Sequence, residues 1–344
     1  MNPVLGILSP AYASVMRMRN WCYNRGVFKT YEIGIPVVSV GNLSVGGTGK
    51  TPVVEWITRY YLEQGLRTAI VSRGYKRETK GTVIVSSGEG PIVDAAQGGD
   101  EPVQLALRCN GASVVVDENR VRGAQLAKEE LGAELIVLDD GFQHRRCGRN
   151  LDIVLLPCGE QLEEQRVLPL GRLREAAEGI QRADLLLVTR CSDERAADAA
   201  QQRIRKYYSG DTAGMSFSPA ALRQLGSEDD QAIDTLHGKR VFGFCGIANP
   251  EEFKQTCLET GLEVAEFRTF PDHHRYTHDE LRELVKAVVD SKCDVLLTTE
   301  KDAVRLADSS KMLDSVQAYY LRMEALPLVH AEILTRALNR LLRA

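Results

Sequence analysis

Between residues 35 and 190 the chain alternates short apolar runs with longer amphipathic stretches. The runs are almost continuous in Val, Ile and Leu, which is typical of strands buried on both faces of a mostly parallel sheet. Helices are predicted between several of them, and the alternation as a whole predicts an α/β domain. The predicted strands cover residues 36–40, 68–71, 82–85, 113–116, 135–138, 153–156 and 185–188, and the main helices cover 52–64, 101–108 and 120–131.

After Arg190 the pattern changes to a polar helix, a short extended piece and an acidic loop at 194–208, 215–217 and 226–230. A second α/β alternation starts at Lys239, with strands at 241–245, 263–267 and 295–298, helices at 250–260 and 279–290, a return strand at 317–321 and a closing helix at 330–342. We therefore expect two domains. The first covers residues 1–215 and is rejoined by the helix at 325–344, and the second covers 236–315, with linkers at 216–235 and 316–324.

The first 25 residues carry an imperfect helical stripe, which Pro10 interrupts and which has basic residues beside it. Two interpretations remain open: a helix packed on its own domain, and an amphipathic segment that lies on an anionic membrane surface. No window of about 18 apolar residues exists, so a membrane-spanning helix is not expected. The stripe consists of Leu5, Leu8, Tyr12, Val15, Met16, Cys22 and Tyr23, with Arg17, Arg19 and Arg25 nearby.

Composition narrows the function classes only slightly. The 344 residues are 44% apolar and 26% charged with a net charge of -4, which indicates a folded chain and does not favour nucleic-acid binding. The eight cysteines include no CxxC pair and no Cys/His spacing of a zinc site. That usage predicts reduced thiols in a cytoplasmic protein.

The strongest chemical signal is the stretch GNLSVGGTGKTP at 41–52, which follows a predicted buried strand and opens a predicted helix. Backbone N–H groups of such a turn form an anion-binding nest at a helix N-terminus. Lys50 is then expected to reach the β- and γ-phosphates of a nucleotide, and the Thr51 hydroxyl to bind Mg²⁺. Ser44 stands where the first glycine of GxxxxGK[ST] is usual, but Gly46, Gly47, Thr48 and Gly49 keep the phosphate cradle.

The stretch LIVLDDGFQH at 135–144 ends a hydrophobic strand in two carboxylates. This is the Walker B arrangement, in which a carboxylate holds Mg²⁺ directly or through water, and the alternative is an Asp pair that caps a turn. Asp139 is the expected metal ligand and Asp140 an expected catalytic residue. His144 is a candidate for contacts with phosphate or hydroxyl groups.

Residues 98–102, Gly-Gly-Asp-Glu-Pro, offer a further pair of carboxylates. Asp100 has two interpretations: an N-cap of the helix that starts near Glu101, or a general base that takes a proton from an acceptor hydroxyl. Glu101 is a further candidate metal ligand.

Basic residues gather on predicted loops after the strands, where α/β sheets bind ligands. Arg73, Arg120, Arg172 and Arg174 are candidates for an anionic, phosphorylated acceptor, although many surface arginines only interact with solvent. In the second domain, Asp272 and His273 are adjacent and form either a proton-handling pair or a surface turn. A guanine-specificity [NT]KxD motif is absent at 299–302 and at 189–192, so ATP is preferred over GTP.

Taken together, these motifs resemble the tetraacyldisaccharide 4'-kinase family of lipid A biosynthesis. The matching stretches cover most of the chain between residue 35 and about residue 305 in the family's order: GNLSVGGTGKTP (41–52), SRGYKR (72–77), GDEP (99–102), LDDGFQHRR (138–146), LPLGRLRE (168–175), FPDHH (270–274) and TTEKD (298–302).

The resemblance implies a P-loop NTPase-like sheet with helices on both faces, and a second, smaller α/β domain that closes over ATP. It implies Mg²⁺-dependent transfer of the γ-phosphate of ATP to the 4'-hydroxyl of a lipid disaccharide 1-phosphate, with Asp100 as the general base and His273 as its partner. It also implies a peripheral enzyme on the cytoplasmic face of the bacterial inner membrane, without nucleic acid or an obligate protein partner. The alternatives are an ATP-dependent ligase and a membrane-surface nucleotide switch.

Overall fold

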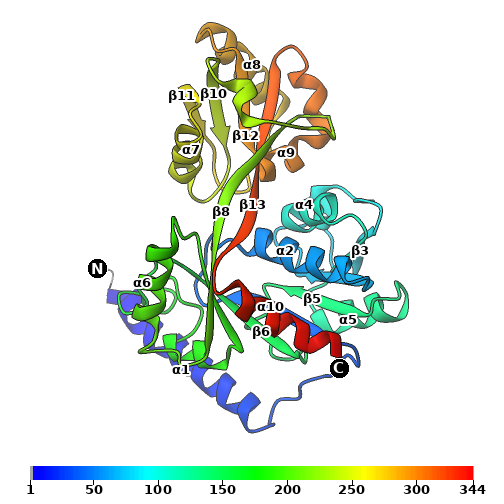
Figure 1. The fold of residues 1–344 in the computed structure, drawn as a ribbon, viewed down its shortest axis with the longest axis vertical. Helices are drawn as coiled ribbons and strands as arrows, with labels where there is room; N and C mark the ends of the chain where they lie inside the picture. Colours follow the sequence, from blue (N-terminus) through cyan, green and yellow to red (C-terminus); the bar gives the residue numbers. More distant parts are fainter. Residues whose placement is uncertain (1–2, 344) are drawn as a thin grey trace. The chain divides into compact units, whose positions relative to one another are not determined.

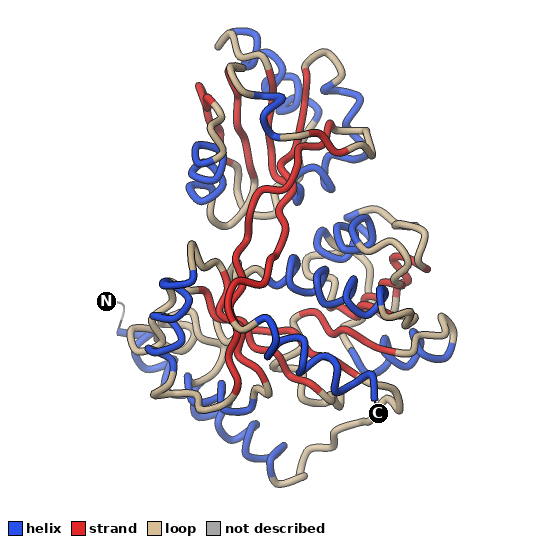
Figure 2. The backbone as a smooth tube through the Cα atoms, viewed as in Figure 1, coloured by secondary structure: helices blue, strands red, loops and turns tan. Residues whose placement is uncertain are grey.

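In the computed structural model, which describes residues 3–343, the chain folds into two compact units (Figure 1). The larger unit holds the residues up to Phe217 together with those from Ala325 on, and the smaller unit is Ser218–Glu324. Two long strands, β8 (Asp211–Gln224) and β13 (Gln317–Val329), continue from one unit into the other (Figure 2). Of the predicted linker at 216–235, the residues from Ser218 on belong to the smaller unit, and so does the whole predicted linker at 316–324.

The larger unit is built on a mostly parallel sheet with the strand order β8-β7-β6-β1-β5-β2-β4-β3. The edge strand β3 runs antiparallel to its neighbour β4. Every strand predicted in this part of the chain is present, because uninterrupted apolar runs are buried on both faces of a central strand. The strands are β1 (Val37–Asn42), β2 (Thr68–Ser72), β3 (Val83–Ser87), β4 (Ser113–Val116), β5 (Leu135–Asp139), β6 (Leu151–Pro157) and β7 (Leu185–Thr189).

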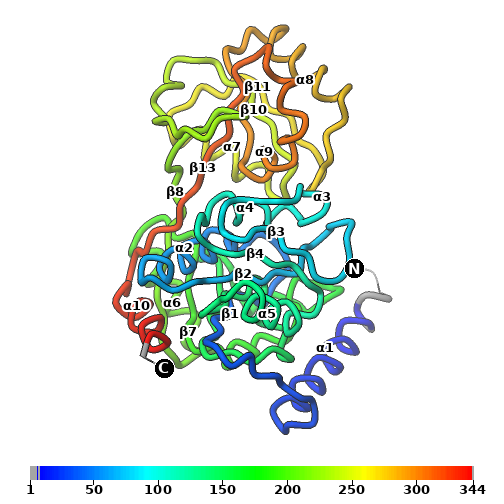
Figure 3. The backbone as a smooth tube through the Cα atoms, turned by 90° about the vertical axis from the view of Figure 1, so that its right-hand side faces the viewer, coloured from blue at the N-terminus to red at the C-terminus, as the bar shows by residue number. Residues whose placement is uncertain are grey.

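Helices cover both faces of this sheet, as predicted (Figure 3). One cluster joins Val71 and Leu138 of the strands to Val121 and Ala124 of α5 (Arg120–Glu129). The other residues of these central strands are also buried. The helix α2 (Lys50–Glu63) packs on β1, β2 and β5. The helix α10 (Ala331–Asn339) returns to α2, where the Tyr61 hydroxyl donates to the Leu338 carbonyl at 3.1 Å. The other helical segments are α3 (Ala95–Gly98), α4 (Asp100–Arg108), α6 (Glu194–Ile204), η1 (Ala177–Arg182) and η4 (Arg340–Arg343).

The smaller unit has a parallel sheet of its own with the order β11-β10-β12-β13. Its buried centre includes Asp302, which accepts hydrogen bonds from the Gly246 amide, the Tyr276 hydroxyl and Arg305 at 2.8–3.2 Å. This carboxylate of the TTEKD stretch therefore links the segments of the smaller unit that carry Gly246, Tyr276 and Arg305. The elements are β9 (Asp230–Gln231), β10 (Arg240–Cys245), β11 (Glu263–Thr269), β12 (Val295–Thr299), α7 (Pro250–Glu259), α8 (His278–Asp290), α9 (Glu300–Leu306), η2 (Ile233–Leu236) and η3 (Ala307–Leu313).

The N-terminal segment forms one helix, α1 (Pro3–Asn24), which continues through Pro10. It lies at the edge of the larger unit (Figures 1 and 3), where the Ser9 hydroxyl donates to the Val167 carbonyl at 2.6 Å. Its outward face is apolar, with Val15, Met18 and Trp21 each more than half exposed.

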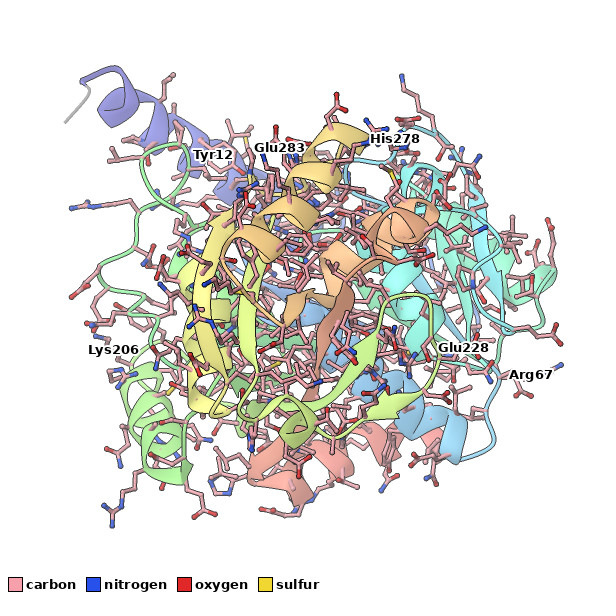
Figure 4. All side chains as sticks on the ribbon, turned by 90° about the horizontal axis from the view of Figure 1, so that it is seen from above. Tyr12, Arg67, Lys206, Glu228, His278 and Glu283 are labelled. Atoms are coloured by element: carbon pink, nitrogen blue, oxygen red, sulfur yellow. The ribbon has the colours of Figure 1, made fainter. Side chains whose placement is uncertain are left out.

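The exposed face of α1 differs from the predicted stripe. Tyr12, labelled in Figure 4, is half-buried, as are Met16, Cys22 and Tyr23, whereas Leu8 and Val15 are exposed. The side chain of Leu5 lies outside the described residues. Within the described residues, no helix combines the length and the apolar character that crossing a membrane requires.

Candidate active site

The predicted phosphate loop connects β1 to α2, and two of its glycines are required by the backbone. Gly46 and Gly49 have φ angles of 121° and 82°, in the region that L side chains avoid. A β-carbon would lie 2.2 Å from the Arg172 guanidinium at Gly46 and 2.0 Å from the Phe217 ring at Gly49. Only glycine therefore fits this turn, which delivers Lys50 and Thr51 to the first turn of α2.

Side chains around the loop hold its shape. The Asn42 amide donates to the Ser44 carbonyl at 2.7 Å and to the Thr48 hydroxyl at 3.0 Å, and the Thr189 hydroxyl donates to the Thr48 carbonyl at 2.9 Å. The Ser44 hydroxyl, at the position where glycine is usual, donates to Glu160 at 3.1 Å. The first amides of α2 have no partner within the helix and point their partial positive charge out of its N-terminus, which suits an anion.

The two carboxylates at the end of β5 face this loop, since β5 is the parallel neighbour of β1. Asp140 Oδ1 lies 3.6 Å from Lys50 Nζ, and both Asp140 oxygens accept from Arg174 Nη1 at 2.8 and 2.7 Å. Asp139 is buried and accepts from the Ser72 hydroxyl at 2.8 Å. The structure thus brings Lys50, Asp139, Asp140 and Arg174 together, whereas the sequence predicts Arg174 only as a contact of the acceptor.

The adjacent aspartates have opposite electrostatic environments. Burial and the neighbouring Asp140 charge raise the pKa of Asp139. Burial alone would also raise the pKa of Asp140, but Lys50 and Arg174 outweigh it and hold that pKa below its usual value. Asp140 is therefore ionised at neutral pH. The charged form of Asp139 is disfavoured by its surroundings, so a bound cation would stabilise Asp139 more.

Arg120 and His144 lie next to the aspartates. Arg120 begins α5 with only 5% of its surface exposed, and Asp140, Asp139 and Arg73 all act on it electrostatically. Burial and the surrounding arginines, Arg120 first among them, lower the pKa of His144 to about 4, so its ring is neutral at pH 7. In the part of the chain that the structure describes, Arg120 Nε and His144 Nε2 are buried without a hydrogen-bond partner. Such buried polar atoms fit a ligand that brings its own oxygens.

Asp100 is the first residue of α4, and the cap position before it is Gly99, which makes no side-chain cap. The N-cap interpretation of Asp100 is therefore wrong. Glu101, the next residue, acts electrostatically on Asp139. A β-carbon at Gly99 would lie 3.2 Å from the Gly74 Cα atom, so the turn after β2 packs against the start of α4 and brings Arg73 to the same edge of the sheet.

Arg172 lies directly against the phosphate loop. Its Nε and Nη2 atoms donate to the Val45 carbonyl at 3.1 and 2.9 Å, and its own carbonyl accepts from the Val45 amide at 2.8 Å. The structure thus gives Arg172 a contact with the loop in addition to its predicted role toward an acceptor.

The histidine pair belongs to the smaller unit. His273 adopts a left-handed backbone with φ of 63°, and its Nε2 atom lies 3.7 Å from Asp272 Oδ2. His274 instead stacks on Phe270 at 4.9 Å and its Nε2 lies 3.0 Å from Glu280, which is also in the capping box of α8. His274 therefore has a structural role in this turn, which favours His273 as the candidate for chemistry.

Sequence reasoning missed several polar residues of this site. Ser72 on Asp139, Asn42 inside the loop, and the pair Gln143 and Glu175 were within the quoted motifs or beside them, but nothing in their pattern pointed to a partner. Their contacts depend on which strands are neighbours in the sheet. Within residues 3–343, no group of three or more His, Cys, Asp or Glu side chains is arranged to hold a metal ion by itself.

Comparison with known proteins decides the family. The model of the tetraacyldisaccharide-1-P 4'-kinase family matches residues 1–343. The chain belongs to this family. Tetraacyldisaccharide 4'-kinases of Chlorobium limicola and Geobacter metallireducens are each 39% identical to it, over 351 and 322 aligned residues. These alignments cover 99% of the chain and 99% of the Chlorobium protein, and 93% of the chain and 93% of the Geobacter protein.

A solved structure of the family agrees with the fold. The crystal structure of the "apo" form of the LpxK protein from Aquifex aeolicus in complex with ATP superposes with a TM-score of 0.80 at 33% identity, covering 97% of each chain. The predicted family and the predicted fold class of a mostly parallel sheet with a second α/β unit are confirmed. The family is one of kinases, which excludes the ligase and the nucleotide switch as the main activity.

Proposed function

We propose that the chain transfers the γ-phosphate of ATP to the 4'-hydroxyl of a tetraacyldisaccharide 1-phosphate, a step of lipid A biosynthesis. The observation that carries the proposal is the contact of Lys50 with Asp140, next to a glycine-dependent phosphate loop, in a chain whose residues 1–343 match this kinase family.

The backbone of Gly46, Gly47, Thr48 and Gly49 surrounds the nucleotide phosphates, and the N-terminus of α2 supports their charge. Lys50 neutralises the charge that develops on the phosphates during transfer. Asp140 orients Lys50 and Arg174, because its ionised carboxylate contacts both cations.

The residues present fit a Mg²⁺ ion that arrives with the nucleotide. Mg²⁺ prefers hard oxygen ligands and is usually held by one or two carboxylates together with substrate phosphates and water. Thr51 and Asp139 would hold it, with Glu101 beside them, and a cation there would offset the unfavourable burial of the Asp139 charge. Bound Mg²⁺ supplies charge neutralisation between the phosphate oxygens.

Asp100 is the proposed general base, and its position as the first residue of α4, next to the turn that contacts Gly74 after β2, supports this role. It takes the proton of the 4'-hydroxyl while that oxygen forms a bond to the γ-phosphorus and the bond from this phosphorus to the bridging oxygen of ADP breaks. His273, beside Asp272, is the proposed partner of this base from the smaller unit.

Arg73, Arg120 and His144 are proposed to contact the acceptor, together with Arg172 and Arg174. The buried polar atoms of Arg120 and His144 support this role, because a phosphate or sugar oxygen would satisfy them. The neutral ring of His144 can accept or donate a hydrogen bond to a hydroxyl group without a change of charge.

We also propose that the enzyme works on the cytoplasmic face of the inner membrane, because an acceptor with four acyl chains is held in a lipid surface. The exposed apolar face of α1 supports it, with Arg17 on the same helix and Arg25 just after it. Apolar side chains enter the lipid boundary, and flanking basic residues are attracted to anionic head groups.

The test is transfer of ³²P from γ-labelled ATP to a purified tetraacyldisaccharide 1-phosphate dispersed in detergent. The wild-type chain should label the lipid, and Lys50→Ala should nearly abolish labelling because a γ-phosphate contact is lost. Lys206→Ala, which removes a surface lysine paired with Glu163, is the matched control and should behave as wild type. Labelling by Lys50→Ala at the wild-type rate would overturn the proposal.

A further inference from the structure

Gln143 connects helix α1 to the phosphate loop within the larger unit. Its backbone carbonyl accepts a hydrogen bond from Arg19 of α1. Its side-chain amide donates to the Asn42 carbonyl at 2.8 Å and to Glu175 Oε1 at 3.1 Å. Its side-chain oxygen accepts from Arg174 Nη1 at 3.2 Å. One residue thus contacts three other segments, α1 through its backbone carbonyl and the other two through its side chain.

On the side of the phosphate loop, two partners of the Gln143 side chain, Arg174 and Asn42, themselves contact residues of the proposed catalytic site. Arg174 donates with the same nitrogen to Asp140, which lies next to Lys50. Asn42 contacts the loop at Ser44 and Thr48, and its Oδ1 atom accepts from Lys50 Nζ at 3.4 Å. A displacement of Gln143 would therefore reach Lys50 along two routes.

On the side of α1, Asn20 makes the second connection. Its amide donates to Glu175 Oε2 at 2.7 Å, and Arg182 donates to both oxygens of the same carboxylate at 2.8 and 2.9 Å. The Glu175 side chain is only 1% exposed. Burial alone would raise its pKa, but Arg182 outweighs this effect and holds the pKa below its usual value, so a fixed carboxylate links Asn20 to Gln143.

We propose that Gln143 is a positioning residue that couples α1 to the phosphate loop, so that the seating of α1 on the larger unit sets the geometry of Lys50 and Asp140. Hydrogen bonds weaken steeply with misalignment, and a buried donor that loses its partner is costly, so a shift of α1 cannot be absorbed by Gln143 alone. Since α1 also carries the exposed apolar face, the coupling makes phosphate transfer respond to how this helix is held. The inference rests on the proposed role of Lys50 in transfer.

A double-mutant cycle between Asn20→Ala and Gln143→Ala tests the coupling, with kcat and KM for ATP measured on detergent-dispersed acceptor. Asn20→Ala should lower kcat by roughly 3- to 10-fold and change KM by less than about twofold, because geometry in the transition state is lost rather than ground-state binding. In the Gln143→Ala background the same change should lower kcat no further, since residues of one network are not additive.

The matched control is Ser14→Ala on the same helix, whose exposed hydroxyl donates to the Pro10 carbonyl within α1 and so does not join the helix to the larger unit. It should leave kcat unchanged in both backgrounds. Thermal unfolding shows whether each variant is folded, and if Gln143→Ala is not, Glu175→Gln replaces it in the cycle. If the effects of Asn20→Ala and the second variant on kcat multiply, or if Ser14→Ala lowers kcat as much as Asn20→Ala does, the proposed coupling is wrong. Full activity of Lys50→Ala would instead overturn the proposed function.

Discussion

At the scale of single residues, the site separates two adjacent aspartates by their surroundings. Asp139 points into the buried edge of the sheet, where Ser72 is its hydrogen-bond donor, and Asp140 turns back in a left-handed conformation with φ of 53° toward Lys50 and Arg174. Their pKa values shift in opposite directions as a result. Two identical side chains therefore have different surroundings: Asp139 suits a bound cation, and Asp140 contacts the cationic side chains of Lys50 and Arg174.

The role of Asp100 is a prediction at this scale. Asp100→Ala should lower kcat by roughly 10²- to 10⁴-fold, the usual effect of removing a general base, and leave ATP binding largely intact. The measurement is steady-state lipid phosphorylation together with ATP binding. Asp94→Ala is the control, because Asp94 caps α3 through the Gln97 amide and its loss should lower stability by about 1 kcal/mol without an effect on chemistry. Turnover near the wild-type rate in Asp100→Ala would refute the base assignment.

His144 provides a second prediction, on pH. Its pKa is about 4 in the folded chain and about 6.5 when unfolded. The unfolded state therefore binds the proton first, and stability is lost as the pH falls from about 6.5 to about 4, by at most about 3 kcal/mol from this residue. His144→Gln should show a smaller loss over that window in urea unfolding.

His278→Gln removes an exposed histidine of α8, labelled in Figure 4, without touching the cluster around His144. It is the matched control for the pH measurement. If the stability of His144→Gln depends on pH in the same way as that of the wild type and of this control, the loss of stability at low pH does not come from His144.

At the scale of elements, the phosphate loop depends on backbone geometry as much as on Lys50. A helix that starts directly after a strand needs a turn, and Gly49 makes this turn in the left-handed region while the Phe217 ring fills the space beside it. The loop thus owes its shape to two glycines and to neighbours from β8 and from the segment that carries Arg172.

The prediction at this scale compares Gly49→Ala with Gly65→Ala at the other end of α2. Both residues have φ near 80°, so both substitutions carry left-handed strain of about 1–2 kcal/mol. A β-carbon meets nothing within 4 Å at Gly65 but would be 2.0 Å from the Phe217 ring at Gly49. Gly49→Ala should abolish ATP binding, measured by calorimetry, whereas Gly65→Ala should only lower the melting temperature. Equal ATP affinity in the two variants would contradict the clash.

The secondary structure was predictable where burial alone determines it. Runs such as residues 135–138 of β5 are apolar without interruption because a central parallel strand is covered on both faces, so composition alone identifies them. The long strand β8 was not predictable beyond residues 215–217, because Asp211–Gln224 mixes Ser, Pro, Ala and Arg and has half-buried positions for much of its length. The outward face of α1 was also misjudged, since its partners at Val167 and Glu175 are distant in sequence.

At the scale of the whole molecule, the chain consists of two α/β units joined by two strands. Asp100, Lys50 and the aspartate pair belong to the larger unit and His273 to the smaller. The proposed membrane association also belongs to this scale, because it would decide whether the enzyme meets an acceptor that is held in a lipid surface.

The corresponding prediction concerns the exposed face of α1. The triple variant Val15→Ser, Met18→Ser and Trp21→Ser should lower the fraction bound to vesicles of phosphatidylethanolamine and phosphatidylglycerol by about tenfold or more, because apolar area no longer enters the lipid boundary. Cosedimentation measures the bound fraction. Val289→Ser, on an equally exposed residue of α8, should leave it unchanged. Unaltered binding of a folded triple variant would refute the membrane role of this face.

The sequence by itself determined the strands of the larger sheet, the phosphate loop and the family, because these depend on local runs of residues that carry their own physical signal. Only the tertiary structure decided which polar groups meet. Ser72 reaches Asp139 because β2 and β5 are neighbours, Asp100 is not a cap because Gly99 occupies that position, and Gln143 contacts both α1 and the phosphate loop. A hydrogen bond needs two groups at a set distance and angle, and no single stretch of sequence contains both.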